Sequence, residues 1–140
     1  MHEHREQGLG EPARRLGRCR YVSLASFRRD GRAVETPVWV AEHDGQLYVF
    51  TEARAGKVKR LRRDPRLRLA PCNAWGALRG DACSGRARIV DDAPTEALAY
   101  RALVDKYGWQ MRLANLGSRL TGRIDARAVL EITLDRAAQA

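Results

Sequence analysis

The stretch RYVSLASFRRDGRAVETPVWVAEHDGQLYVFT, residues 20–51, alternates β-forming runs with two Asp-Gly pairs. Asp-Gly is typical of tight hairpin turns, because glycine adopts positive φ without steric penalty. The pairs Asp30-Gly31 and Asp44-Gly45 therefore separate three segments that are rich in β-formers. The three strands are expected at 20–27, 33–41 and 47–51. They are predicted to follow one another as an antiparallel meander.

Pro37 interrupts the second of these expected strands. Proline has no N–H to donate to a strand ladder, so it usually marks an edge strand or a bulge. Such positions often border ligands. The sequence therefore draws attention to the residues around Pro37.

The rest of the chain predicts helices and further strands around the same core. Residues 57–63 favour a short helix with Val58 and Leu61 as its buried stripe, ended before Pro65. A longer helix is predicted between the N-cap Asp92 and Gly108. The other expected elements are strands at 66–71, 84–91 and 128–134 and a second helix of a helical pair at 109–120. The fold class is mainly β with α.

The length indicates one domain. The chain has 140 residues, enough for a single continuous core but too few for two ordinary ones. Residues 1–10 lack hydrophobic periodicity and are expected to form a flexible tail, with a short helix beginning near Pro12. The single domain is then expected to cover residues 11–140.

Basic residues dominate the charge. The sequence contains 26 Lys and Arg against 17 Asp and Glu, a formal charge of +9, which favours an anionic ligand or surface. Eight of these basic residues lie between Arg54 and Arg68, with Asp64 as the single acid. A basic helix that begins at Gly56 could bind an anion through its N-terminal amides together with Lys57 and Arg60. A solvated helix face is the alternative for these side chains, and the residues alone leave both open.

Several other functions lack the residues that they need. No GxSxG, GxGxxG or GxxxxGK[ST] pattern occurs, and the three histidines, His2, His4 and His43, form no triad or metal constellation. Three widely spaced cysteines without a CxxC motif indicate neither a disulfide framework nor a zinc site. No segment approaches the roughly 20 apolar residues that a membrane span requires. We expect a soluble, cytoplasmic protein without a catalytic acid, base or nucleophile and without a bound metal.

The order of these motifs resembles a known family. Residues 20–73 are similar to the split β-barrel flavin and deazaflavin oxidoreductases, the superfamily of pyridoxamine phosphate oxidase, and most closely to its deazaflavin-dependent branch. The similarity rests on TPVW at 36–39, on T-x-x-x-x-G-K-x-x-R at 51–60 and on RDPR at 63–66. The segment KYGWQMRLANLGSRLTGR, residues 106–123, resembles the helical region before the last strand of that branch.

The resemblance implies a split β-barrel homodimer with a cofactor in a groove between the protomers. Lys57 and Arg60 match the phosphate-contacting positions, and Thr51 and Gly56 would add hydroxyl and amide donors. The flat ring would lie along Thr36, Pro37, Val38 and Trp39, although an isolated tryptophan more often packs in a core.

The implied activity is that of an oxidoreductase dependent on coenzyme F420, the hydroxy-deazaflavin, whose phosphate and glutamyl tail suit the basic stretch. It would transfer a hydride between this cofactor and a small conjugated organic substrate. FMN is the alternative cofactor. Pyridoxamine phosphate oxidation itself is not expected, because the substrate-phosphate residues of those enzymes have no match here.

Two further classes remain as alternatives. A non-catalytic barrel could hold a cofactor, haem or another tetrapyrrole, but no expected strand offers an obvious haem-ligating histidine. Nucleic-acid binding would suit the pI near 10.3, yet neither a recognised motif nor a row of stacking aromatic residues accompanies the charge. An oxidoreductase is the preferred interpretation.

Overall fold

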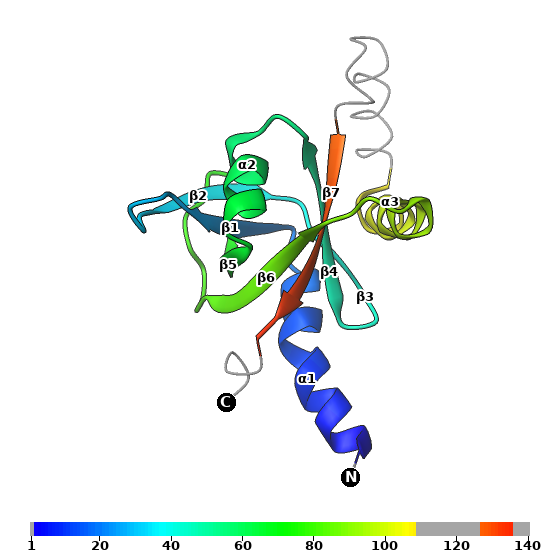
Figure 1. The fold of residues 1–140 in the computed structure, drawn as a ribbon. Helices are drawn as coiled ribbons and strands as arrows, with labels where there is room; N and C mark the ends of the chain where they lie inside the picture. Colours follow the sequence, from blue (N-terminus) through cyan, green and yellow to red (C-terminus); the bar gives the residue numbers. More distant parts are fainter. Residues whose placement is uncertain (1, 109–126, 136–140) are drawn as a thin grey trace.

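The computed structural model describes residues 2–108 and 127–135, and it shows a seven-stranded antiparallel sheet with three helices (Figure 1). The strands run in the order β2-β1-β5-β6-β7-β4-β3. The elements are α1 (His2–Gly17), β1 (Tyr21–Phe27), β2 (Ala33–Val38), β3 (Ala41–His43), β4 (Gln46–Glu52), α2 (Gly56–Arg63), β5 (Arg66–Cys72), β6 (Cys83–Ile89), α3 (Ala93–Tyr107) and β7 (Arg127–Leu134).

Both predicted hairpins are present, but the predicted three-strand meander is wrong. The second expected strand, 33–41, is divided into β2, which pairs with β1, and β3, which pairs with β4. These two pairs lie at opposite ends of the sheet order. Pro37 lacks a donor, and the chain leaves the ladder after Val38 and turns a corner at residues 39–40. Because the two edge strands are consecutive in the chain, the sheet curls into a split barrel.

Helix α1 begins earlier than the sequence predicts. It covers His2–Gly17, whereas a flexible tail was expected up to Gly10 and a helix only from Pro12. Ala13 and Leu16, near its C-terminal end, belong to the main core and are almost fully buried. Because this end is anchored, the helix extends toward its N-terminus with little nucleation penalty. It therefore continues past two glycines and past Pro12, whose missing N–H removes one helical hydrogen bond.

The main core fills the inside of the curled sheet. It joins residues of α1 and α2 to leucines and valines from most of the strands. Helix α2 contributes Leu61 to this core, and its Val58 is also fully buried, as the predicted stripe requires. Helix α2 packs against β1 and β6, so its position is fixed by the sheet rather than by its own short length.

Helix α3 matches its predicted boundaries. The Asp92 carboxylate accepts a hydrogen bond of 3.0 Å from the backbone N–H of Thr95, and Gly108 at the other end has a φ of 60°. Leu103 and Tyr107 are buried against β3 and β4. The predicted helix at 109–120 lies outside the described residues.

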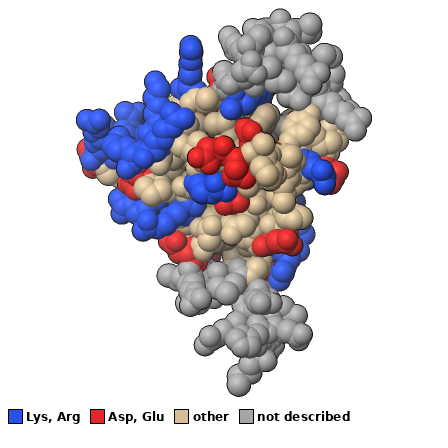
Figure 2. Space-filling model, turned by 45° about the vertical axis from the view of Figure 1, so that its right-hand side comes forward, with Lys and Arg blue, Asp and Glu red and all other residues tan. Residues whose placement is uncertain are grey.

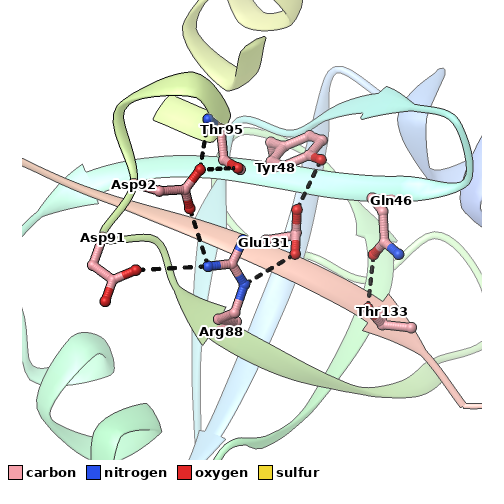
Figure 3. A network of polar contacts seen from close by, with 8 residues as sticks. All are labelled: Gln46, Tyr48, Arg88, Asp91, Asp92, Thr95, Glu131 and Thr133. Atoms are coloured by element: carbon pink, nitrogen blue, oxygen red, sulfur yellow. Dashed lines mark hydrogen bonds and ion pairs between the residues drawn. The ribbon is translucent and has the colours of Figure 1, made fainter. Parts of the chain in front are cut away.

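Paired charges connect β6, β7 and the start of α3 (Figure 3). Arg88 Nε donates to the Glu131 carboxylate at 3.1 Å, and its Nη1 lies 3.3 Å from Asp92 Oδ1. The Tyr48 hydroxyl donates to the other Glu131 oxygen at 3.0 Å. Burial, followed by this hydrogen bond, raises the pKa of Tyr48 to about 12. We call Tyr48, Arg88, Asp92 and Glu131 the charge network.

Candidate cofactor-binding site

The first turn of α2 follows the end of β4. Thr51 is half-buried and pairs with Ala128 of β7, and the backbone then turns so that Ala55 N–H donates to Glu52 O at 3.0 Å. Among the described residues, the backbone N–H groups of Gly56 and Lys57 have no acceptor. No acidic side chain lies in the first turn of α2. These two donors are therefore available to an anion at the positive end of the helix.

The Arg60 side chain folds back over this turn. Its Nε donates to the Ser26 hydroxyl on β1 at 2.7 Å. A β-carbon placed on Gly56 would lie 2.9 Å from Arg60 Nη1, so the glycine leaves room for the guanidinium. The helix N-terminus and the Arg60 guanidinium thus lie together. We call Gly56, Lys57 and Arg60 the anion seat.

Positive charge predominates at the anion seat, although the Glu52 carboxylate acts weakly on Lys57. Lys57 is half-buried and, within the described part of the chain, makes no hydrogen bond or ion pair. Burial, followed by the charge of Arg60, lowers the pKa of Lys57. Burial, followed by the charges of Arg28 and Arg63, lowers the pKa of Arg60. Each of these effects disfavours the cation, and a bound anion would relieve the repulsion.

A second positively charged region adjoins the anion seat. Residues of the β1–β2 turn and of α2 surround a hollow of about 380 Å³. We call it the arginine hollow, and it is lined by Arg28, Arg29, Asp30, Arg32, Arg60 and Arg63. Figure 2 shows Lys and Arg gathered on the side where Figure 1 places this turn and α2. Arg60 belongs to both features, so the positive surface is continuous.

The acids near the arginine hollow already have partners. Asp30 lies 2.8 Å from Arg32 Nε, and Asp64 lies 2.9 Å from Arg66 Nη2. Among the residues that the structure describes, no carboxylate pairs with the four remaining guanidinium groups. These groups belong to Arg28, Arg29, Arg60 and Arg63. The hollow can therefore attract further negative charge on a ligand that occupies the anion seat.

The second predicted group of site residues lies on β2 and at the corner after it. The Thr36 hydroxyl is buried and has no hydrogen-bond partner. An unsatisfied buried hydroxyl is unfavourable, and a ligand with a polar group could satisfy it. Pro37 is exposed, whereas Val38 is buried in the main core. Of these residues, Thr36 and Pro37 are the ones best suited to contact a ligand.

Trp39 packs against α3. Its ring is stacked on that of Tyr107, with centroids 4.6 Å apart and planes 9° from parallel. Trp39 is half-buried rather than fully covered, so part of its surface is open. The sequence suggested that Trp39 could pack in a core, and its stacking on Tyr107 agrees with this for one face of the indole.

Strand β1 separates the two groups of predicted site residues. Ser26, which accepts from Arg60, pairs with Val34 of β2, and Leu24 pairs with Thr36. Paired residues of an antiparallel ladder, and residues two apart, share one face of the sheet. Ser26 and Thr36 are therefore on the same face. Among the described residues, no hydrogen bond links 36–39 directly to the anion seat.

Sequence reasoning missed the residues that fix the corner at Val40. The Tyr107 hydroxyl accepts from Val40 N–H at 3.0 Å and donates to Arg20 O at 2.8 Å, which connects α3 to two strands. Lys106 donates to the carbonyl oxygens of Cys19 and Val40. Burial lowers the pKa of Lys106 to about 8 and raises that of Tyr107 to about 12. No motif at the end of the α3 segment signals these long-range contacts.

The chemistry of the donors fits an anionic, ring-bearing cofactor. Free amides, a half-buried lysine and a guanidinium suit a phosphate, and the buried Thr36 hydroxyl suits a polar group on a ring. Within the described residues, no group of three or more His, Cys, Asp or Glu could hold a metal ion. In the same part of the chain, no helix is long and apolar enough to cross a membrane.

The sheet order and the curled, open barrel define a split-barrel protein. A family model described as pyridoxamine 5'-phosphate oxidase matches residues 11–139, so the chain belongs to this family. No curated protein sequence matches the chain.

Solved structures show the same fold. A conserved hypothetical protein from Mycobacterium tuberculosis is 25% identical, with a TM-score of 0.67, 90% of this chain covered and 79% of that one. A FAD-binding protein from Mesorhizobium loti is 18% identical, with a TM-score of 0.62 and coverages of 90% and 87%. The haem storage protein of Vibrio cholerae is 10% identical, with a TM-score of 0.67 and 91% of each chain covered.

Proposed function

We propose that this protein is an oxidoreductase that binds coenzyme F420 and transfers a hydride between it and a small conjugated organic substrate. The observation that carries the proposal is the excess of positive charge at the anion seat, continued by the arginine hollow. A deazaflavin cofactor with one phosphate and an acidic glutamyl tail would place negative charge along both.

In this proposal the cofactor supplies the hydride chemistry. The residues of the chain bind and orient it. Lys57 and Arg60 would hold the phosphate together with the free amides of α2, and the Thr36 hydroxyl would be available to a polar group of the cofactor. Such a site needs no protein acid, base or nucleophile at the reacting atoms, in agreement with the lack of such a motif in the sequence.

FMN is the second candidate cofactor. A FAD-binding protein shares the fold, and the anion seat alone would satisfy a single phosphate. The arginine hollow distinguishes the two cofactors, because FMN carries no acidic tail to fill it. A non-catalytic haem protein is a third possibility, since the haem storage protein of Vibrio cholerae also shares the fold. His43, the one histidine on a described strand, is exposed and lies 3.3 Å from Asp44, which does not favour haem ligation.

The proposal includes a homodimer with the cofactor groove between its two copies. Residues 36–39 lie on and just after β2, which is an edge strand of the sheet. A second copy of the chain could pack against this edge and cover the ring of the cofactor. We also propose a cytoplasmic location, because Cys19, Cys72 and Cys83 are all free and suit a reducing compartment.

The direct test is titration of the purified protein with F420, FMN and haem, followed by absorbance and fluorescence at low and high salt. We expect F420 to bind more tightly than FMN, with a preference that shrinks as salt screens the arginine hollow. Tighter FMN binding would favour the alternative cofactor. Failure of both F420 and FMN to bind at low salt would contradict the oxidoreductase proposal.

A further inference from the structure

The loop between β5 and β6 carries an unusual amount of exposed apolar surface. Among the described residues, the exposed large hydrophobic side chains are Trp75 and Leu78, which are 88% and 53% exposed. Both lie on this one loop, residues 73–82. Exposed apolar surface that is concentrated in one place often marks a binding site.

The backbone of this loop is fixed. Asn73 Oδ1 accepts hydrogen bonds from the N–H groups of Trp75 and Ala77, at 3.0 and 2.9 Å. Gly76 N–H donates to Asn73 O at 3.0 Å, and Gly76 has a φ of 90°, which glycine adopts readily. The indole of Trp75 is therefore presented to solvent by an ordered turn. Because the turn is already ordered, binding a ligand there costs less conformational entropy.

The same loop lies beside the strip that is proposed to hold the ring. A β-carbon on Gly76 would be 3.8 Å from Pro37 Cδ, an ordinary van der Waals contact. Further along, Leu78 bridges to Cys72, and a β-carbon on Gly80 would be 3.3 Å from Pro71. Trp75 therefore directly precedes Gly76, the residue that lies against Pro37.

We propose that Trp75 forms one wall of the ring site and stacks on the planar ring of the cofactor, opposite the strip at 36–39. This inference rests on the proposed function. An indole offers a large flat surface, and stacked aromatic pairs gain stability beyond the area they bury.

The test compares Trp75→Ala and Trp75→Phe with the wild type. The control is Leu78→Ala, which removes the other exposed apolar side chain of the loop. The probes are FMN and riboflavin, which share a ring but differ in the phosphate, and F420. Affinity is measured by fluorescence titration, and the mass in solution is measured by light scattering.

We expect Trp75→Ala to lower the affinities for FMN and for riboflavin by the same factor, roughly 3- to 10-fold, because the indole contacts the ring that both ligands share. Trp75→Phe should retain most of the affinity, and Leu78→Ala should match the wild type. The mass in solution should be the same for all four proteins. In the wild type, flavin should quench the fluorescence of Trp75, and Trp75→Phe should lose that part of the quenching.

Unchanged affinity in Trp75→Ala would overturn the inference and leave the proposed function intact. A loss of affinity accompanied by a change in mass would also overturn it, since Trp75 would then be a contact between copies of the chain. If the wild type binds none of the three probes, the proposed function fails and the inference fails with it.

Discussion

The anion seat and the charge network both contain an arginine but differ in how their charges are balanced. In the charge network, Arg88 reaches both Glu131 and Asp92, and every member has a partner. In the anion seat, Lys57 and Arg60 lie together and the described residues form no ion pair with either of them, although the charge of Glu52 acts on Lys57 more weakly than burial and Arg60 do. Paired charges therefore hold elements of this fold together, whereas unpaired charges are available to a ligand.

The largest effect is expected from removing the unpaired charges. The double variant Lys57→Ala, Arg60→Ala should lose FMN or F420 affinity by about 100-fold or more, since each charge-assisted contact contributes about 1.5 to 3 kcal/mol. Fluorescence titration measures the loss. The matched control is Lys59→Ala, Arg62→Ala, which removes the same charge from exposed positions of the same helix.

That control should weaken binding only slightly, through the general potential of the surface. Equal losses in the two double variants would show that net charge, rather than the anion seat, determines the affinity. The unpaired charges of the anion seat would then not account for ligand binding.

A smaller effect, on folding rather than on binding, is expected from the charge network. Glu131→Ala leaves the buried Tyr48 hydroxyl and the Arg88 guanidinium without their shared acceptor. The free energy of unfolding should fall by about 1 to 2 kcal/mol, because Arg88 is half-exposed and the ion pair is partly screened. Urea denaturation measures this change.

Cofactor affinity should stay at the wild-type value in Glu131→Ala at temperatures where the variant is folded. Glu131→Gln keeps an acceptor for Tyr48 and should recover part of the lost stability. A marked loss of cofactor affinity in either variant would show that the charge network also contributes to ligand binding.

The smallest effect concerns pH. Hydrogen bonds from the Thr95 hydroxyl and backbone N–H hold the pKa of Asp92 below its usual 3.8. A carboxyl whose pKa is lower in the folded state stabilises the protein above pH 3.8, and this contribution is lost as the pH falls through the folded-state value. Asp92→Asn keeps a good N-cap but removes the titration. Its stability should therefore decline less steeply than that of the wild type below about pH 4, as measured by urea denaturation across the acid range. Parallel declines would show that Asp92 contributes no pH dependence.

Local sequence signals were sufficient for most elements. The Asp-Gly pairs located both hairpin turns, the i, i+3 spacing of Val58 and Leu61 located the buried side of α2, and Asp92 with Gly108 bounded α3. Each of these signals acts over a few residues, so it survives without knowledge of the rest of the chain. Lys57 and Arg60, three positions apart, are close on α2 for the same reason.

The features that the sequence did not predict depend on contacts between distant segments of the chain. Pro37 marked an irregularity in the run 33–41, but only the pairing of its two halves with different partners revealed the break after Val38. The start of α1 was missed because its anchor, Ala13 and Leu16, depends on the core of the sheet. The approach of Arg60 to Ser26, 34 positions away, gave no sequence signal either.

The sequence by itself determined most of the strands, the hairpin turns, the short basic helix and the excess of positive charge, because these depend on neighbours along the chain. Only the tertiary structure decided which charges are paired. It placed Glu131 and Asp92 against Arg88 and left Lys57 and Arg60 beside free amides. It also placed the loop of Trp75 against Pro37. Which charges pair and which loops lie close together depends on how the sheet curls. The curl of the sheet is set by the packing of the whole core.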